Sequence, residues 1–171
     1  MSVRPFRLGF PAALATLALD QITKAAVLAW MTAPPIPLTP FFNLTLSFNA
    51  GVTFGIGRRL GADGASLLAV GAAVIIAMLL WWLSRAKSRV EACGIGLIIG
   101  GALGNVVDRL RQGAVTDWLD LHVAAWHWPI FNLADVAIVS GVALLLSASL
   151  LPQRYASRRA LGGHLRTRNH P

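Results

Sequence analysis

Two aspartates, Asp117 and Asp135, lie at the edges of apolar segments in a chain with few charges. A carboxylate close to hydrocarbon is costly to place, so its presence indicates a function. Two carboxylates that approach one another share a proton. The ionised one can then take a proton from water, while the protonated one polarises a carbonyl group. The pair therefore predicts hydrolysis of a peptide bond by an aspartic dyad.

Further polar residues are expected close to this pair, beginning with Asp20 and Lys24. These two are four residues apart, so they share one helix face, and the acid precedes the base. Their spacing favours mutual neutralisation within a membrane helix, with direct contact to a substrate as the alternative.

A second polar group comprises Asn105, Asp108 and Arg109, at i, i+3 and i+4 of one helix. This spacing places all three on one face, where we expect Asp108 and Arg109 to form a charged brace rather than a catalytic pair. Asn132 and Asp135 are likewise three residues apart and face the same way.

Other chemistries are less well supported by the sequence. His122 and His127 are five residues apart and lack a partner at zinc-binding spacing, so we expect no metal and no other cofactor. The serines have no nucleophile motif around them. Asp63 and Asp120 lie outside the apolar segments, and we expect both to be solvated.

The composition indicates a membrane protein, because 56% of the residues are hydrophobic and only 13% are charged. Four apolar segments, at about 8–30, 65–83, 92–110 and 130–151, approach or exceed the length that crosses about 30 Å of hydrocarbon. The third is the shortest, and it spans only if its helix continues through Asp108 and Arg109. Asp20 and Lys24 interrupt the first segment, which favours a retained helix over a cleaved signal peptide.

The segment between the first two spans is expected to be rich in β-structure, over about residues 38–57. Several prolines precede it and disfavour helix. Residues 42–49 then alternate apolar and polar, which is typical of a strand with one apolar face. That face would consist of Phe42, Leu44, Leu46 and Phe48, and it would rest on lipid or on a substrate's acyl chains. The fold class is therefore an all-α membrane protein of four transmembrane helices, with a small extracytoplasmic β-sheet or cradle.

The distribution of cations predicts the orientation. Ten of the 15 Lys and Arg residues fall near the N-terminus, near residues 85–89 and beyond residue 153. With four spans these clusters share one side, which the positive-inside rule makes cytoplasmic. We expect both termini on that side, one membrane domain over residues 1–152, and a basic, disordered tail over 153–171. The net charge of +8 then reflects membrane topology and lipid attraction, not nucleic-acid binding.

Five blocks occur in an order that resembles the bacterial lipoprotein signal peptidases (signal peptidase II): DQITK at 20–24, FNAGVTFG at 48–55, GGALGNVVDR at 100–109, VTDW at 115–118 and FNLAD at 131–135. The resemblance covers about residues 10–150. Trp118 stands where phenylalanine is usual in the family, and Thr53 where alanine is common, which puts selectivity rather than catalysis in doubt.

The resemblance implies an aspartic endopeptidase of the bacterial inner membrane, with its active site near the outer face. It would remove the signal peptide of diacylglyceryl-modified prolipoproteins just before the lipidated cysteine. The catalytic dyad matches Asp117 and Asp135. Residues that line the site or support it match Asn49, Gly51, Asn105, Arg109, Asn132, Asp20, Lys24 and Asp108. Lipidated prolipoproteins and membrane lipids are the expected partners of a monomeric enzyme.

Two other functional classes remain open on the residues alone. A small proton- or cation-coupled transporter could use the same carboxylates as a relay, although four spans without an internal repeat disfavour it. A catalytically silent membrane scaffold is disfavoured because Asn, Asp and Arg residues gather at one depth.

Overall fold

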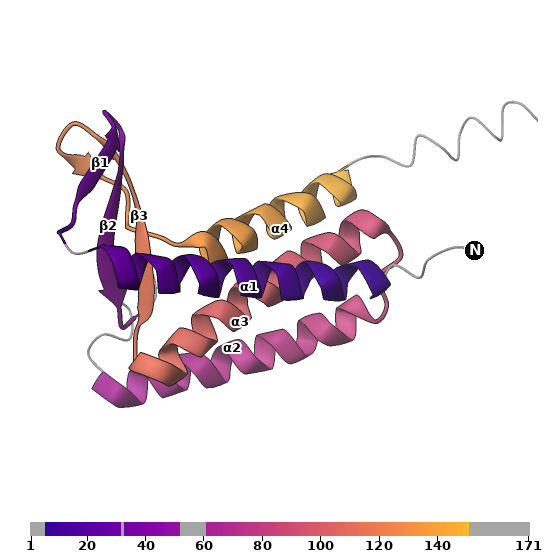
Figure 1. Ribbon diagram of the computed structural model, residues 1–171. Coiled ribbons are helices and arrows are strands. Elements are labelled where there is room, and N and C mark those ends of the chain that lie inside the picture. The colour runs from indigo at the N-terminus through magenta and orange to yellow at the C-terminus, as the bar shows by residue number, and fades with distance from the viewer. Residues whose placement is uncertain (1–5, 32, 52–60, 151–171) are drawn as a thin grey trace, which may run out of the picture.

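Four helices lie alongside one another, and a small sheet crosses one end of them (Figure 1). The structure is a computed structural model, and it describes residues 6–31, 33–51 and 61–150, without the side chains of 61–65. The helices are α1 (Phe6–Trp30), α2 (Gly61–Leu83), α3 (Arg89–Gln112) and α4 (Leu133–Leu150). Each contains a stretch long and apolar enough to cross a membrane, which confirms the expected fold class. The predicted tail and Thr53 lie outside the described residues, as does the side chain of Asp63.

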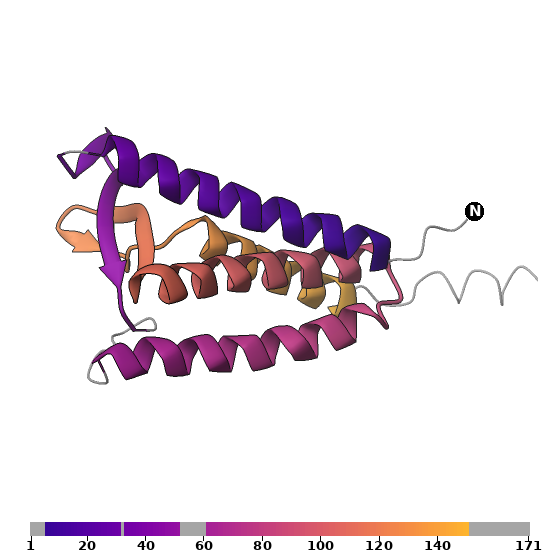
Figure 2. The ribbon, with the colours of Figure 1, turned by 60° about the horizontal axis from the view of Figure 1, so that its bottom comes forward.

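Helix α3 is central to the bundle, and glycines allow its neighbours to approach closely (Figure 2). A Cβ atom at Gly100 would collide with the carbonyl of Ala13 in α1, and one at Gly101 with the carbonyl of Ala134 in α4. Such close backbone approach suits helices in lipid, where packing rather than water exclusion drives association. The short third apolar segment spans because its helix continues through the polar residues as far as Gln112.

The sheet is antiparallel, in the order β1 (Ile36–Thr39), β2 (Phe42–Asn49), β3 (Val115–Val123) and β4 (Trp126–His127). The strand expected at residues 42–49 is present. Its partner β3 was not predicted. Leu119, Leu121 and Val123 alternate with Asp120 and His122, and this period could have identified the strand.

A β-bulge in β2 changes which of its side chains share a face of the sheet. Leu44 pairs with Leu119 and Ser47 pairs with Asp117, so two residues of β2 oppose Trp118 alone. Because one extra residue reverses the alternation, Phe42 and Leu44 share a face with Ser47, while Phe48 points to the other side. The single apolar face of Phe42, Leu44, Leu46 and Phe48 is therefore wrong.

A buried ionic cluster joins α1 to α3 and α4. The Lys24 ammonium lies 2.9 Å from Asp20 Oδ2 and 3.0 Å from Asp108 Oδ2, and all three side chains are at most 6% exposed. Asp20 also accepts a hydrogen bond from the backbone N–H of Ala134, at the start of α4. The predicted pairing of Asp20 with Lys24 is present. The predicted Asp108–Arg109 brace is wrong, because Lys24 is the cation that reaches Asp108.

Replacing Lys24 with methionine is expected to destabilise the protein by about 3–5 kcal/mol, because two buried carboxylates lose their shared cation. The double variant Lys24→Met/Asp108→Asn returns the cluster to a single negative charge, so it should recover part of that loss. Chemical unfolding in detergent micelles would measure both. Equal stability of the wild type and Lys24→Met would contradict the role given to the cluster.

Candidate active site

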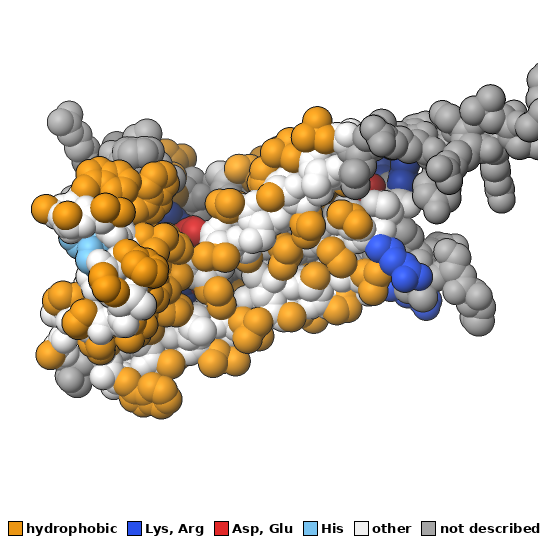
Figure 3. Space-filling model, turned by 90° about the horizontal axis from the view of Figure 1, so that it is seen from above, with side chains coloured by type: hydrophobic (Ala, Val, Ile, Leu, Met, Phe, Trp, Pro, Cys, Tyr) orange, Lys and Arg blue, Asp and Glu red, His pale blue; other side chains and the backbone are white. Residues whose placement is uncertain are grey.

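A cavity of about 650 Å³ opens where the sheet meets α3 and α4, and both Asp117 and Asp135 line it. Asn49, Asn105 and Arg109 supply further polar groups. The remaining wall is mostly apolar and comes from residues 128–131 and from one face of α4. In the space-filling view, an acidic side chain shows at this junction among hydrophobic side chains (Figure 3).

Asp117 reaches the cavity from β3, and its side chain is held on both oxygens. Asn132 Nδ2 donates to Oδ1 over 2.6 Å, and Asn49 Nδ2 donates to Oδ2 over 3.2 Å. Burial, supplemented by the charge of Asp135, raises the pKa of Asp117 to about 6 despite these two hydrogen bonds. This carboxyl group is therefore poised to exchange a proton near neutral pH.

Asp135 lies in the first turn of α4 and is fixed by the residue that precedes the helix. The Asn132 side chain accepts a hydrogen bond from the Asp135 N–H over 3.0 Å, and Asp135 Oδ2 accepts one from the Asn132 N–H over 3.2 Å. These reciprocal bonds form a capping box, which starts a helix and fixes its first side chains. The spacing of three residues between Asn132 and Asp135 is what permits it.

Asn105 connects the two carboxylates to the buried ionic cluster. Its Nδ2 donates to Asp135 Oδ1 over 3.0 Å. Its Oδ1 accepts from Lys24 Nζ over 3.1 Å and from Asn132 Nδ2 over 3.2 Å. Since Lys24 can only donate, the oxygen of Asn105 must face it, and its nitrogen must face Asp135. The orientation of the Asn132 amide follows in turn, because its nitrogen must donate to the Asn105 oxygen.

Arg109 fastens the segment after β2 to α3. Its guanidinium donates to the carbonyl oxygens of Gly51 and Asn105, over 3.0 and 3.1 Å. The Gly51 N–H in turn donates to Asn49 Oδ1 over 3.1 Å. Asn49 thus contacts Asp117 directly, and Gly51 is linked to Asp117 through Asn49.

The sequence did not identify every residue of this region. Gln21 donates to both Asp20 and Asp108, over 3.2 and 3.1 Å, and only its place between the polar residues of α1 hinted at this. The apolar wall at 128–131 was also missed. The expectation that Asp120 is solvated is wrong, because it is only 4% exposed.

The arrangement suits acid–base chemistry by two carboxylates that open onto one cavity and are oriented by neutral amides. Within the described part of the chain, no three His, Cys, Asp or Glu side chains are grouped so as to hold a metal ion. The carboxyl group of Asp117, with a pKa of about 6 and beside a second carboxylate, can hold a proton and donate it to a substrate carbonyl.

Known proteins resemble this chain in sequence and in fold. A family described as signal peptidase (SPase) II matches residues 12–151. A lipoprotein signal peptidase of Methylobacterium sp. (strain 4-46) is 46% identical over 148 residues, covering 84% of this chain and 89% of that relative. One from Burkholderia mallei (strain SAVP1) is 46% identical over 137 residues, covering 78% and 81%.

A solved structure gives the same result for the fold. A bacterial membrane enzyme determined by the in meso method at 1.9 Å resolution superposes with a TM-score of 0.72 at 27% identity, covering 85% of this chain and 94% of that one. The sequence match covers most of the chain, and the described helices and sheet follow the same fold. The chain therefore belongs to the signal peptidase II family and is a multi-pass peptidase of the bacterial membrane.

Proposed function

We propose that Asp117 and Asp135 form the catalytic dyad of this peptidase and cleave lipidated prolipoproteins before the lipidated cysteine. The observation that carries the proposal is that both carboxylates line one cavity whose remaining wall is mostly apolar, with Asn49, Asn105 and Arg109 as further polar groups. Relatives that cover most of the chain are named lipoprotein signal peptidases, which supports the same class of substrate.

The two carboxylates are placed for different roles. Asp117, with its raised pKa, holds the shared proton and donates it toward the scissile carbonyl oxygen. Asp135 takes a proton from water, whose oxygen adds to the carbonyl carbon. Its position in the first turn of α4 favours a negative charge there. Collapse of the tetrahedral intermediate then breaks the C–N bond. The leaving amine takes up the proton held by Asp135, and Asp117 recovers its proton from a hydroxyl group of the intermediate.

The substrate's lipid explains the location of the cavity. A diacylglyceryl group cannot leave the bilayer, so the reacting carboxylates must come to the membrane surface. Val136 and Val139 of α4 line the cavity and are 39% and 68% exposed, so the apolar wall continues onto the helix surface.

Asp117→Asn and Asp135→Asn are each expected to lower turnover by at least about a hundredfold, because an amide can neither take nor share the proton. Asp108→Asn should instead lower stability while the folded fraction keeps its turnover. Cleavage of a lipidated prolipoprotein by purified protein, with the unlipidated form beside it, would measure all three. Near-normal turnover by either dyad variant would remove that residue from the mechanism.

The pH dependence should follow Asp117. Its pKa of about 6 is raised, so the proton is present below that pH and is lost as the pH rises through it. We expect kcat/KM of the wild type to fall as the pH rises through about 6, since this parameter reports ionisations of the free enzyme. A constant kcat/KM between about pH 5 and about pH 8 would contradict the assignment of the proton to Asp117.

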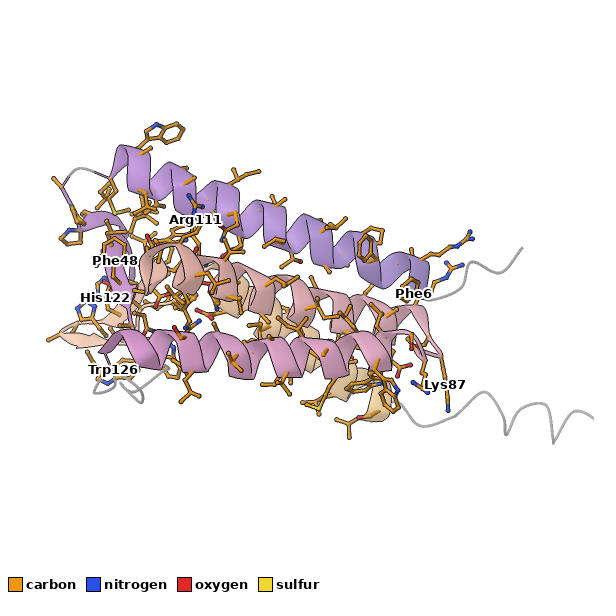
Figure 4. The ribbon with its side chains drawn as sticks, turned by 90° about the horizontal axis from the view of Figure 1, so that it is seen from below. Phe6, Phe48, Lys87, Arg111, His122 and Trp126 are labelled. Carbon is orange, nitrogen blue, oxygen red and sulfur yellow. The ribbon has the colours of Figure 1, made fainter. Side chains whose placement is uncertain are left out.

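We further propose that the end of the bundle that carries the sheet is extracytoplasmic. The described cations Arg7, Arg85, Lys87 and Arg89 lie toward the other end, which the positive-inside rule makes cytoplasmic. Figure 4 shows Phe6 and Lys87 at that end, and Phe48, His122 and Trp126 at the sheet.

Labelling with a membrane-impermeant thiol reagent would test the orientation. In a variant whose only native cysteine, Cys93, is replaced by serine, Val123→Cys should react in intact spheroplasts because Val123 is 71% exposed at the sheet. Lys87→Cys should react only after the membrane is opened. The reverse pattern would invert the proposed topology.

A further inference from the structure

Asp120, a second buried carboxylate of β3, faces away from the dyad. It is three residues from Asp117, so the pleat of the strand places the two on opposite faces of the sheet. Asp120 Oδ2 accepts from Asn43 Nδ2 over 3.1 Å, and Oδ1 lies 2.7 Å from His127 Nδ1. One carboxylate therefore ties together β2, β3 and β4. Burial raises the pKa of Asp120, but these hydrogen bonds outweigh that effect and hold the pKa below its usual value.

His127 needs this contact because β4 is too short to hold its own position. The strand has two residues, and only two pairs join it to β3, His122 with His127 and Val123 with Trp126. A hairpin of that length is marginal without further contacts. The His127 ring also stacks on His122, with centroids 4.9 Å apart and an interplanar angle of 21°. Asp120 and His122 together fix the ring of His127.

The residues directly after His127 form the apolar wall of the active-site cavity. Trp128 N–H donates to the Leu121 carbonyl over 2.8 Å, and Phe131 N–H donates to the Leu119 carbonyl over 3.1 Å. Between these two bonds, residues 128–131 line the cavity that contains Asp117 and Asp135. The next residue, Asn132, donates to both carboxylates, from its side chain to Asp117 and from its backbone N–H to Asp135. The direction in which the chain leaves His127 thus decides where this wall lies.

We infer that Asp120 and His127 are positioning residues, which fix the wall at 128–131 and thereby set how tightly the apolar part of the substrate binds. Neither residue lines the cavity, so the effect passes through the backbone. The inference rests on the proposed function for its effect on substrate binding, but not for its effect on the wall itself.

A matched pair of variants separates the hydrogen bond from the bulk of the side chain. His127→Leu removes the donor to Asp120, whereas His127→Asn keeps an N–H donor close to the position of Nδ1. We expect KM for a lipidated prolipoprotein to rise about tenfold in His127→Leu, equivalent to about 1.4 kcal/mol. The value of kcat should stay within about twofold, because Asp117 and Asp135 keep their partners. In His127→Asn, KM should return to within about threefold of the wild type.

Hydrogen exchange tests the wall without any need for catalysis. The amides of Trp128 and Phe131 should exchange about tenfold faster in His127→Leu and at nearly the wild-type rate in His127→Asn. Val123→Ala, at an exposed position of the same hairpin, serves as the control and should change neither amide. If His127→Leu proves too unstable to purify, Asp120→Asn replaces it, and the same two amides should again exchange faster.

Each outcome decides one claim. Unchanged exchange in His127→Leu would overturn the inference even if the enzyme cleaves lipoproteins as proposed. Faster exchange that extends into α3 would show a general loss of stability and would also overturn it. A wild-type protein that fails to cleave would overturn the proposed function, and the exchange result would still decide whether Asp120 and His127 hold the wall.

Discussion

The Lys24 ammonium must find acceptors inside a membrane span, and much of the structure depends on how it does so. Asp20, Asp108 and Asn105 supply the three acceptors, which matches the three hydrogens of the ammonium group. These contacts draw α1 against α3 and commit the Asn105 oxygen to Lys24. The Asn105 nitrogen is thereby left for Asp135. The neutralisation of one buried charge thus also orients an amide at the cavity that contains Asp117 and Asp135.

The amides Asn105 and Asn132 separate the ionic cluster from the dyad. They lie between Asp20 and Asp108 on one side and Asp117 and Asp135 on the other. Their hydrogen bonds link the position of Lys24 to the positions of Asp117 and Asp135. Asn132 has two roles. Its side-chain oxygen accepts from the Asp135 N–H and so caps α4, and its side-chain nitrogen donates to Asp117. One side chain thus both caps α4 and positions a residue of the proposed catalytic pair. A site built in this way needs few residues, which suits a bundle with little interior volume.

The sequence predicted the parts of this protein that depend on local pattern. Long apolar runs identified the four spans, and the rarity of charge within them drew attention to Asp20, Lys24, Asp108, Asp117 and Asp135. Partnerships across the bundle were harder, because the pairing of Lys24 with Asp108 depends on which helices are adjacent. The proximity of Asp108 to Arg109 along the chain suggested a brace that the fold does not form. Asp120 was misjudged for a similar reason, since its burial comes from strands that only the folded sheet brings together.

The bulge in β2 reverses which face of the sheet the following side chains of that strand occupy. Phe42 and Leu44 face the same side as Ser47 and Asn49 only because two residues occupy the space opposite Trp118. The same residues paired with β3 without the bulge would turn Asn49 away from Asp117 and present Phe48 in its place. The bulge, and not residue type alone, is what brings an amide rather than a phenyl ring to the carboxylate. Among relatives, loss of one residue between positions 44 and 47 would accordingly remove the bulge and still leave Asn49 on the side of Asp117.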